Sequence, residues 1–238
     1  MLHAMLRAAV RDFYAQEVLA DSPVAYWRLG EASGTTAFDE VGGYDGTYTG
    51  SPTLGATGLI AGDSDTAMSL ASATDDGVTI PNHADLMPTT AISVEAWFTV
   101  DAANSGNSRI VAADQASTTQ TYHLLLNSSR NFSWRVKSGG TWYGGDFDGD
   151  SPTADGSTIY HMVGTYDGSY VRLYINGVAQ TTTYAATGPL NVATADLELG
   201  FKSTQPDSDF AGTLDEVAIY DAALSAARIE AHYNAGTT

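Results

Sequence analysis

Short runs of residues that favour β-strands fill most of this 238-residue chain. From Val24 onward, stretches rich in Val, Ile, Thr, Tyr and Trp are separated by clusters of Gly, Asp, Asn, Ser and Pro. This is the pattern of short strands joined by turns. About eleven such runs can be distinguished, a number that suits a sandwich or a barrel. The sequence therefore predicts an all-β fold in one domain, and the chain is long enough to bury a core of its own.

One of these runs, ISVEAWFTV, indicates which face of its strand is buried. Alternate residues of a strand lie on the same face of the sheet. The alternating apolar residues are Ile92, Val94, Ala96, Phe98 and Val100. We expect this face to point into the core.

Local signals mark two tight turns and a closing helix. Asp-Gly at 167–168 and Asn-Gly at 176–177 readily reach the positive φ of hairpin turns. They predict a meander of three strands. Near the end of the chain, Ser225 is placed to cap a helix, which Asn234 and Gly236 are expected to close.

The first 20 residues have a helical pattern instead. Their apolar side chains recur at spacings of four and three, which places them on one face of a helix. These side chains are Leu2, Leu6, Ala9 and Phe13. We therefore divide the chain into an N-terminal helix, residues 1–22, and a β domain, residues 23–238. The helix either packs on the β domain or anchors the chain to a partner, and both options stay open.

The composition excludes several classes of function. The chain has 10 Lys and Arg against 28 Asp and Glu, a net charge of −18, which repels nucleic acid and anionic lipid surfaces. No apolar run approaches the roughly 18 residues needed to cross a bilayer, and charged residues interrupt the start where a signal peptide needs an apolar centre. Because cysteine is absent, disulfides, thiolate metal sites and cysteine catalysis are excluded.

Four segments, in this order, resemble the laminin G-like or concanavalin A-like jelly-roll superfamily. They are PVAYWRLGEASGTTAFDEVGGYDGTY, ISVEAWFTV, YHMVGTYDGSYVRLYINGVAQ and FAGTLDEVAIYDAALSAARIEAHYN. In the third segment, Tyr160 and His161 stand where the family usually has Trp. The resemblance implies two antiparallel sheets packed face to face, one of them concave. Such folds serve mostly as carbohydrate-binding or protein-binding modules, with some glycosidase branches, so the fold does not fix the function. The opening segment is also similar to modules of bacterial and bacteriophage surface or virion proteins.

The resemblance further implies a Ca²⁺ site. In the family, an Asp in the first loop, loop carbonyls after it and the Asp of the closing DEV strand commonly surround one ion. On this chain these positions are Asp39, the carbonyls of Gly42 and Tyr44, and Asp215. Gly43 stands where many relatives have Asn, so one side-chain oxygen is missing. The alternative is that both aspartates cap turns by accepting backbone N–H groups.

A second candidate site combines aromatic and polar residues between positions 121 and 150. Glycan sites pair an aromatic platform with groups that bind hydroxyls. The residues expected to bind a ligand are Trp142, Tyr143, Asp146, Asp148, Tyr122 and Asn127. Trp142 and Tyr143 are expected to be exposed, whereas a place in the core is the alternative for Tyr122.

Catalytic patterns are not evident in the sequence. A glycosidase needs two carboxyl groups about 5 to 10 Å apart, and the carboxylate pattern of the laminarinase-like branch is absent. Asp215 and Glu216 are adjacent in a predicted strand, so we expect their side chains to point to opposite faces. The sequence favours a protein without catalytic activity.

Two functions stay in competition. The first is a non-catalytic module that binds glycan and is stabilised by Ca²⁺. The second is a structural virion protein, a phage decoration or tail-appendage subunit, which acts through protein contacts and is anchored by its N-terminal helix. Both place the chain at an extracellular surface or in a virion, and both allow it to form a homo-oligomer.

Overall fold

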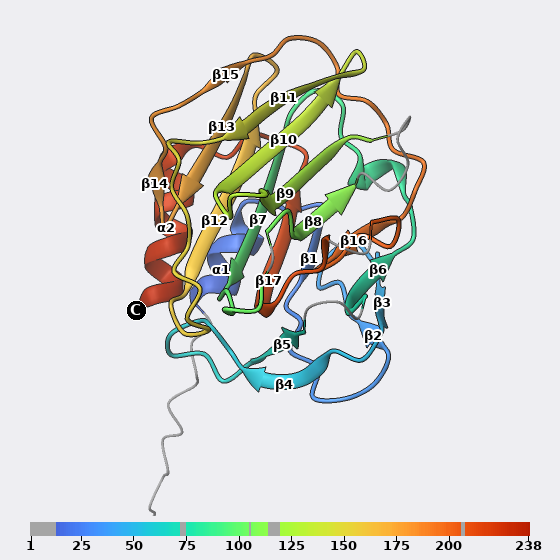
Figure 1. Ribbon diagram of the computed structural model, residues 1–238, viewed down its shortest axis with the longest axis vertical. Coiled ribbons are helices and arrows are strands. Elements are labelled where there is room, and N and C mark those ends of the chain that lie inside the picture. Colours follow the sequence, from blue (N-terminus) through green and yellow to red (C-terminus); the bar gives the residue numbers. More distant parts are fainter. Residues whose placement is uncertain (1–12, 72–74, 105, 114–119, 206–207) are drawn as a thin grey trace, which may run out of the picture.

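Two antiparallel β-sheets packed face to face form the body of the protein. In the computed structural model, residues 13–71, 75–104, 106–113, 120–205 and 208–238 are described. The eight-stranded sheet lies in front in Figure 1, with the nine-stranded sheet behind it and two helices against the outer face of the latter. This arrangement confirms the predicted two-sheet jelly-roll sandwich with a helix at each end.

The nine-stranded sheet contains the long central strands. Its members are β1 (Ala25–Trp27), β4 (Thr53–Thr57), β5 (Thr66–Leu70), β7 (Ile92–Phe98), β12 (Tyr160–Tyr166), β13 (Tyr170–Ile175), β14 (Val178–Ala179), β15 (Tyr184–Ala185) and β17 (Gly212–Tyr220). The order is β14-β13-β12-β7-β17-β5-β4, with β1 beside β17 and β15 beside β13. Strands distant in sequence are therefore neighbours, and the last strand lies against β1.

The eight-stranded sheet covers the other side of the core. Its members are β2 (Thr36–Ala37), β3 (Gly46–Thr49), β6 (Gly77–Ile80), β8 (Arg109–Ala113), β9 (Tyr122–Leu126), β10 (Phe132–Ser138), β11 (Thr141–Asp146) and β16 (Leu197–Leu199). The order is β11-β10-β9-β8-β16-β6-β3-β2. A single turn of 3₁₀ helix, η1 (Ala84–Leu86), lies in the connection between β6 and β7.

The face of β7 that points into the core is the one that the sequence predicts. Its four alternating apolar side chains, and Val100 just beyond its end, are buried in the main hydrophobic cluster between the sheets. Across from them, Trp134 of β10 is fully buried and lies against Gly164 of β12, where a Cβ would come within 2.3 Å of the indole. Glycine at this position therefore lets the two sheets approach closely.

The predicted meander is confirmed as β12-β13-β14. Asp167 accepts backbone N–H groups from Ser169 and Tyr170 at 2.9 and 2.7 Å, and so closes the first turn. In the second turn, Asn176 and Gly177 have φ of 52° and 77°, values that Asn and Gly reach at little cost.

Both helices pack on the outer face of the nine-stranded sheet. Helix α1 (Phe13–Ala20) buries Tyr14, Ala15 and Val18, in a cluster that includes Trp97 of β7. Of the two options left open for the N-terminal helix, packing on the β domain is the one that α1 shows. The expected start of this helix, residues 1–12, lies outside the described residues.

Helix α2 (Ala226–Thr237) begins as predicted, with the Ser225 side chain accepting the N–H of Arg228 at 3.3 Å. It does not end at Gly236, which is helical and buried. A Cβ on Gly236 would lie 2.4 Å from the indole of Trp97. The glycine therefore provides close contact with the sheet rather than a helix end.

A buried polar cluster joins the helices to the sheet beneath them. The carboxylate of Glu95, on the polar face of β7, is fully buried. It accepts hydrogen bonds from Tyr14 of α1 at 2.8 Å and Tyr220 of β17 at 3.0 Å. The rings of His161 and His232 lie 2.7 and 3.0 Å from it. We call these five residues the Glu95 cluster.

Candidate ligand pocket at the end of the sandwich

The pocket is built on a loop that folds around one carboxylate. Asp39 accepts four backbone N–H groups, from Tyr26 at 2.8 Å, Val41 at 3.2 Å, Gly42 at 2.7 Å and Tyr44 at 2.9 Å. The loop between β2 and β3 is held in a tight curve in this way, as Asp commonly holds turns.

This curve requires glycine at position 42. A Cβ there would lie 2.4 Å from the ring of Tyr44 and 2.5 Å from the carbonyl oxygen of Val24. The carbonyl of Tyr44 accepts the indole N–H of Trp27 at 2.9 Å. The backbone on both sides of Tyr44 is therefore fixed, and its ring is directed toward η1.

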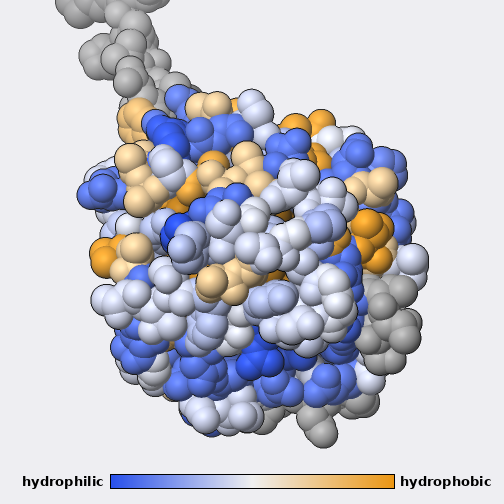
Figure 2. Space-filling view, turned by 90° about the horizontal axis from the view of Figure 1, so that it is seen from above, coloured by the Kyte–Doolittle hydropathy of each residue, from blue (hydrophilic) through white to orange (hydrophobic). Residues whose placement is uncertain are grey.

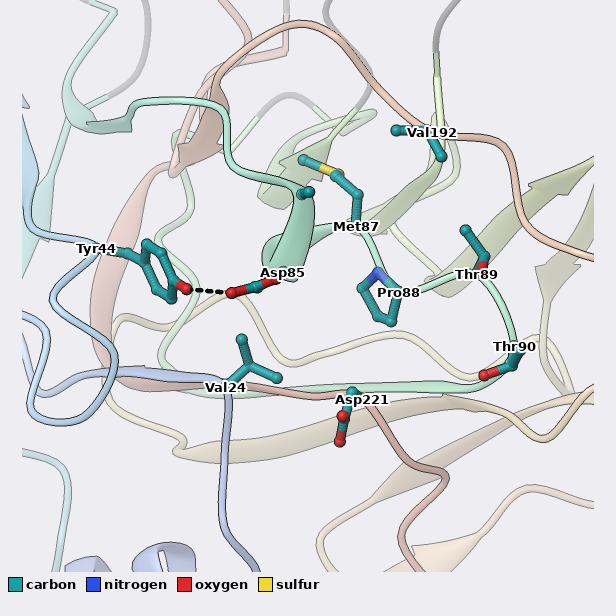
Figure 3. A pocket seen from close by; sticks show the side chains of 10 residues that line it. Val24, Tyr44, Asp85, Met87, Pro88, Thr89, Thr90, Val192 and Asp221 are labelled. Carbon is teal, nitrogen blue, oxygen red and sulfur yellow. Dashed lines mark hydrogen bonds between the residues drawn. The ribbon is translucent and has the colours of Figure 1, made fainter.

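Tyr44 and η1 form one wall of the pocket (Figure 3). The Tyr44 hydroxyl donates to Asp85 Oδ2 at 2.6 Å, and the ring lies 4.7 Å from that of His83. The hydrogen bond to Asp85 raises the pKa of Tyr44. The phenol therefore stays protonated and keeps the Asp85 carboxylate oriented.

The cavity has a volume of about 600 Å³ and combines apolar walls with oxygen acceptors. Its lining residues are Val24, Tyr44, Ala84, Asp85, Met87, Pro88, Thr89, Thr90, Val192 and Asp221. Two of them carry carboxylates, three carry hydroxyl groups, and none carries a positive charge. Such a lining suits a ligand with several hydroxyl donors and an apolar face, and it disfavours an anion.

Sequence reasoning named Tyr44 only for its carbonyl in the predicted calcium site, and it missed this pocket. His83, Asp85 and Asp221 come from two connections far apart in sequence, which meet only when β1, β7 and β17 pair. One signal in the sequence could have indicated the pocket. The segment NHADLMPTT, residues 82–90, places a histidine and an aspartate close to Pro88 in a connection between strands.

The residues predicted to bind Ca²⁺ are engaged with protein groups. Both oxygens of Asp39 accept N–H groups of its own loop, and Asp215 Oδ2 accepts the N–H of Leu59 at 2.8 Å. Burial raises the pKa of Asp215 to about 8, which favours its neutral form at neutral pH. Among the described residues, no group of three or more His, Asp or Glu side chains is placed to hold a metal ion. These contacts do not fit a calcium site, and Ca²⁺ binding stays a prediction.

The expectation that Asp215 and Glu216 point to opposite faces is wrong. The pairing of β17 with β7 shifts between Asp215 and Ala218, and Glu216 has a φ of 52°, so a bulge breaks the alternation. Burial and then the charge of Asp215 raise the pKa of Glu216. Its Oε1 also accepts from Arg28 at 3.0 Å. The two carboxyl groups thus lie in one buried cluster.

The predicted aromatic and acidic site is only partly assembled. Trp142 of β11 is half-buried on the outer face of its sheet, where it stacks on His123 at 4.5 Å. Tyr143 is directed inward, against the main core. Asp146 is exposed and accepts from the Asn127 amide. Asp148 accepts from the backbone and side chains of the 181–182 turn.

Two members of that predicted site have structural roles. Tyr122 is fully buried, and its hydroxyl donates to the carbonyl of Leu86 at 2.8 Å. A side chain without exposed surface cannot contact a ligand, so Tyr122 is corrected to a core residue. Asn127 is 7% exposed and its Oδ1 accepts the N–H groups of Ser129 and Asn131, which assigns it to a turn.

A family model described as "Concanavalin A-like lectin/glucanases superfamily" matches residues 72–230, more than half of the chain. The chain belongs to this superfamily. No curated protein sequence matches it. The superfamily assignment agrees with the pairing of the strands and with the four segments noted in the sequence.

Solved structures with this fold include domain 4 of AbnA, a GH43 extracellular arabinanase from Geobacillus stearothermophilus, in complex with arabinotriose. The TM-score is 0.65 at 21% identity, over 89% of this chain and 98% of that one. The binding domain of Paraclostridial Mosquitocidal Protein 1 has a TM-score of 0.67 at 16% identity, over 91% of this chain and 52% of that one. Trypanosoma rangeli sialidase in complex with sialic acid has a TM-score of 0.60 at 14% identity, over 88% of this chain and 32% of that one. At these identities the likeness concerns the fold.

The surface at one end of the molecule is mixed rather than broadly apolar. Figure 2 shows hydrophilic residues over most of one end of the molecule, with apolar residues in small separate groups. Neither helix in the described part of the chain has the length and apolar character needed to span a bilayer.

Proposed function

We propose that this chain is a non-catalytic carbohydrate-binding module that acts at an extracellular surface and holds a neutral glycan in the pocket beside Tyr44. The observation that carries the proposal is the pocket itself, in which an aromatic ring, two carboxylates and two threonine hydroxyls surround one cavity of about 600 Å³. The arabinotriose complex of a structurally similar domain supports it.

The charges of the pocket select the kind of glycan. Asp85 and Asp221 accept hydrogen bonds from sugar hydroxyls, and Met87 and Pro88 supply apolar contact. A uronic or sialic acid would bring a further negative charge to a lining without cations. The net charge of −18 opposes the binding of such an acidic sugar as well. A neutral sugar is therefore the preferred ligand.

The positions of the carboxyl groups support a binding role without catalysis. A glycosidase needs a carboxylic acid that remains protonated near neutral pH. Two carboxyl groups with a raised pKa are those of Asp215 and Glu216. Both are almost completely buried and neither lines the pocket. A substrate in the pocket would not reach them.

The test is a glycan array with the full chain, followed by calorimetry with the glycans retained. Replacing Asp85→Asn or Asp221→Asn removes a charged acceptor, and each is expected to weaken binding about tenfold, or ~1.4 kcal/mol. Val192→Trp fills the cavity and should abolish binding. Glu230→Gln, an equal charge change on the exposed side of α2, is the control.

Two results would overturn the proposal. The first is an array with no neutral glycan retained, or binding that is equal in all four variants. The second concerns catalysis: release of new reducing ends from a bound glycan would contradict the non-catalytic role.

The alternative, assembly through the N-terminal helix, has one observation in its favour. On α1, Phe13 and Leu19 are 50% and 46% exposed, although the opposite face of the helix is buried. Apolar side chains on the outside of a short helix suit a protein contact. Double replacement by Ser should then abolish self-association or partner binding, measured by light scattering and pull-down, while the melting temperature stays unchanged. An unaltered assembly would reject this role.

A further inference from the structure

A row of hydroxyl side chains crosses four adjacent strands of the nine-stranded sheet. Ser69 of β5 is the register partner of Thr53 on β4 and of Thr213 on β17. The N–H of Thr99, the residue after β7, donates to the carbonyl of Thr213 at 3.0 Å. These four residues are called the hydroxyl row. Its first two strands, β4 and β5, lie at the bottom of the view in Figure 1.

The hydroxyl row faces away from the core. Residues next to it in sequence belong to the main hydrophobic cluster: Met68, Leu70, Phe98, Val100 and Leu214. Since successive residues of a strand point to opposite faces, the row lies on the outer face. Thr53 is exposed, and Ser69 and Thr213 are half-buried. Among the hydrogen bonds of the described residues, none uses the hydroxyl group of these three side chains. Their hydroxyls are therefore available to a ligand.

Two cavities lie over the hydroxyl row, and Ser69 lines both of them. The larger has a volume of about 340 Å³. Its floor includes Ser69, Thr99 and Thr213, and its walls come from residues 56–59 and from the loop that ends at Ile159. The smaller has a volume of about 240 Å³ and includes Thr53. The two cavities together, which follow the row across the strands, are called the groove.

Both walls of the larger cavity are held by hydrogen bonds to carboxylates outside it. On one side, the N–H of Leu59 donates to Asp215 Oδ2 at 2.8 Å. On the other side, Asp155 accepts the N–H groups of Ser157 and Thr158 at 2.8 and 2.7 Å. The cavity is therefore formed before a ligand enters, which lowers the cost of binding.

The lining of the groove favours a neutral ligand rich in hydroxyl groups. Residues 46–62, which include one wall, contain no charged side chain. The larger cavity has no charged residue in its lining, and the smaller has two that are both acidic, Asp76 and Asp101. An anion is disfavoured there. Each hydroxyl offers one donor and two acceptor sites, as the hydroxyls of a sugar do. Ile159, which is 40% exposed, supplies apolar surface for a sugar ring.

The length of the row sets the size of this ligand. Neighbouring strands are about 4.8 Å apart, so the first and last hydroxyls of four strands are about 14 Å apart. Several sugar units are needed to contact the whole row. We propose that the groove binds an internal segment of a linear neutral polysaccharide, which lies across the strands. The groove shares no lining residue with the pocket beside Tyr44, and the proposal does not depend on that pocket.

The experiment is native electrophoresis of the full chain in gels that contain linear arabinan, pullulan or glucomannan. At least one of these neutral polymers should retard the protein, whereas polygalacturonate should not. Calorimetry then uses oligosaccharides of the polymer that is bound. The hexasaccharide should bind at least tenfold more tightly than the disaccharide, because only the longer chain reaches all four strands.

Variants assign the binding to the groove. The double change Ser69→Ala and Thr213→Val removes two hydroxyls and alters the shape of the floor little. It should lower the affinity for the hexasaccharide about tenfold. Thr57→Trp fills the larger cavity from an exposed position and should abolish binding. Thr141→Val, at an exposed position on β11 of the other sheet, is the control, and melting curves verify that each variant folds.

The outcomes separate this proposal from the proposed function. Three results would each overturn the groove: no retardation by any of the neutral polymers, equal affinity for the disaccharide and the hexasaccharide, or a double variant that binds like wild type. Asp85→Asn tests the pocket beside Tyr44. Binding that is lost in Asp85→Asn but unaltered in Thr57→Trp belongs to the pocket and also overturns the groove. The reverse result supports the groove and rejects the pocket.

Discussion

His232 Nδ1, on the last helix, lies 3.0 Å from Glu95 Oε2, at the middle of the central strand β7. The other ring nitrogen lies 2.9 Å from Asp21 Oδ2, just after α1. One imidazole thus joins both ends of the described chain to the sheet. No disulfide is available to join these parts of the chain. This buried contact is one of the interactions that hold the two helices on the sheet.

Glu95→Gln should be among the most destabilising single substitutions in the protein. Burial alone would raise the pKa of Glu95, but the charge of His232 and hydrogen bonds from His161 and His232 hold it well below its usual value. Removing the charge takes away one of the two counter-ions of the buried His232 imidazole, the other being Asp21. We expect a loss of about 3 to 5 kcal/mol, measured by urea unfolding. Glu230→Gln, exposed on α2, should change stability by less than about 0.5 kcal/mol; similar losses in both would refute this role.

The contact between His232 and Glu95 also predicts how stability varies with pH. Burial acts to lower the pKa of His232, but the charge and hydrogen bond of Glu95, together with those of Asp21, raise it above 6.5. A histidine whose folded pKa is raised contributes fully below its unfolded pKa, and the contribution is lost as pH rises through the folded value. The stability of wild type minus that of His232→Gln should therefore decline as pH rises above the ordinary histidine pKa of about 6.5. A difference that is constant or grows with pH would contradict this sign.

Much of the fold could be predicted because its signals are local. The alternation in β7, the Asn176-Gly177 turn and the Ser225 cap each depend on a few neighbouring residues, and each is confirmed. The Glu95 cluster could not be found in this way. Its members are separated by up to 218 residues, from Tyr14 to His232, and a single histidine carries no sign of its partner. A charged residue within an apolar strand was the one available clue.

The sequence singled out only the loop that forms one wall of the candidate site, and it did so as a calcium site. Tyr44 and the Asp39 loop come from a single segment, whereas Asp221 reaches the pocket through the pairing of β17 with β1 and β7. The relation of Asp215 to Glu216 was predicted wrongly because the rule of alternation assumes a regular strand. The bulge that changes it depends on the register with β7, a tertiary property.

Asp215→Asn should stabilise the protein in neutral and basic solution. Burial raises the pKa of Asp215 to about 8, and its Oδ1 is buried without a hydrogen-bond partner. An acid with a raised folded pKa folds best when protonated, so its cost grows as pH rises from about 4 to about 8. The neutral amide avoids this cost. We expect a gain of about 1 to 3 kcal/mol at pH 8, close to zero at pH 4. The exposed Glu40→Gln should show no such pH dependence, and a destabilised Asp215→Asn at pH 8 would contradict the prediction.

Gly236→Ala should destabilise the protein even though alanine favours helices. In an open helix this change gains up to about 1 kcal/mol, but here the new Cβ would lie 2.4 Å from the indole of Trp97. Displacing α2 from the sheet to relieve this contact costs about 1 to 3 kcal/mol. Asn234→Ala, on the exposed side of the same helix, should be neutral or slightly stabilising. Thermal unfolding of both variants measures the contrast, and a more stable Gly236→Ala would show that the helix is not pressed against Trp97.

Asp39→Asn decides between a structural loop and a calcium site. The carboxylate accepts four N–H groups through two oxygens, whereas an amide offers one oxygen, so at least one buried or half-buried N–H loses its partner. We expect a loss of about 1 to 3 kcal/mol and weaker glycan binding, because the same carboxylate orients Tyr44. If the loop is held by these bonds alone, the loss is the same in millimolar calcium and in EDTA. Glu40→Gln, the next residue, should leave both measurements unchanged. A melting temperature that calcium raises in wild type and not in Asp39→Asn would instead establish the metal site that the family resemblance implied.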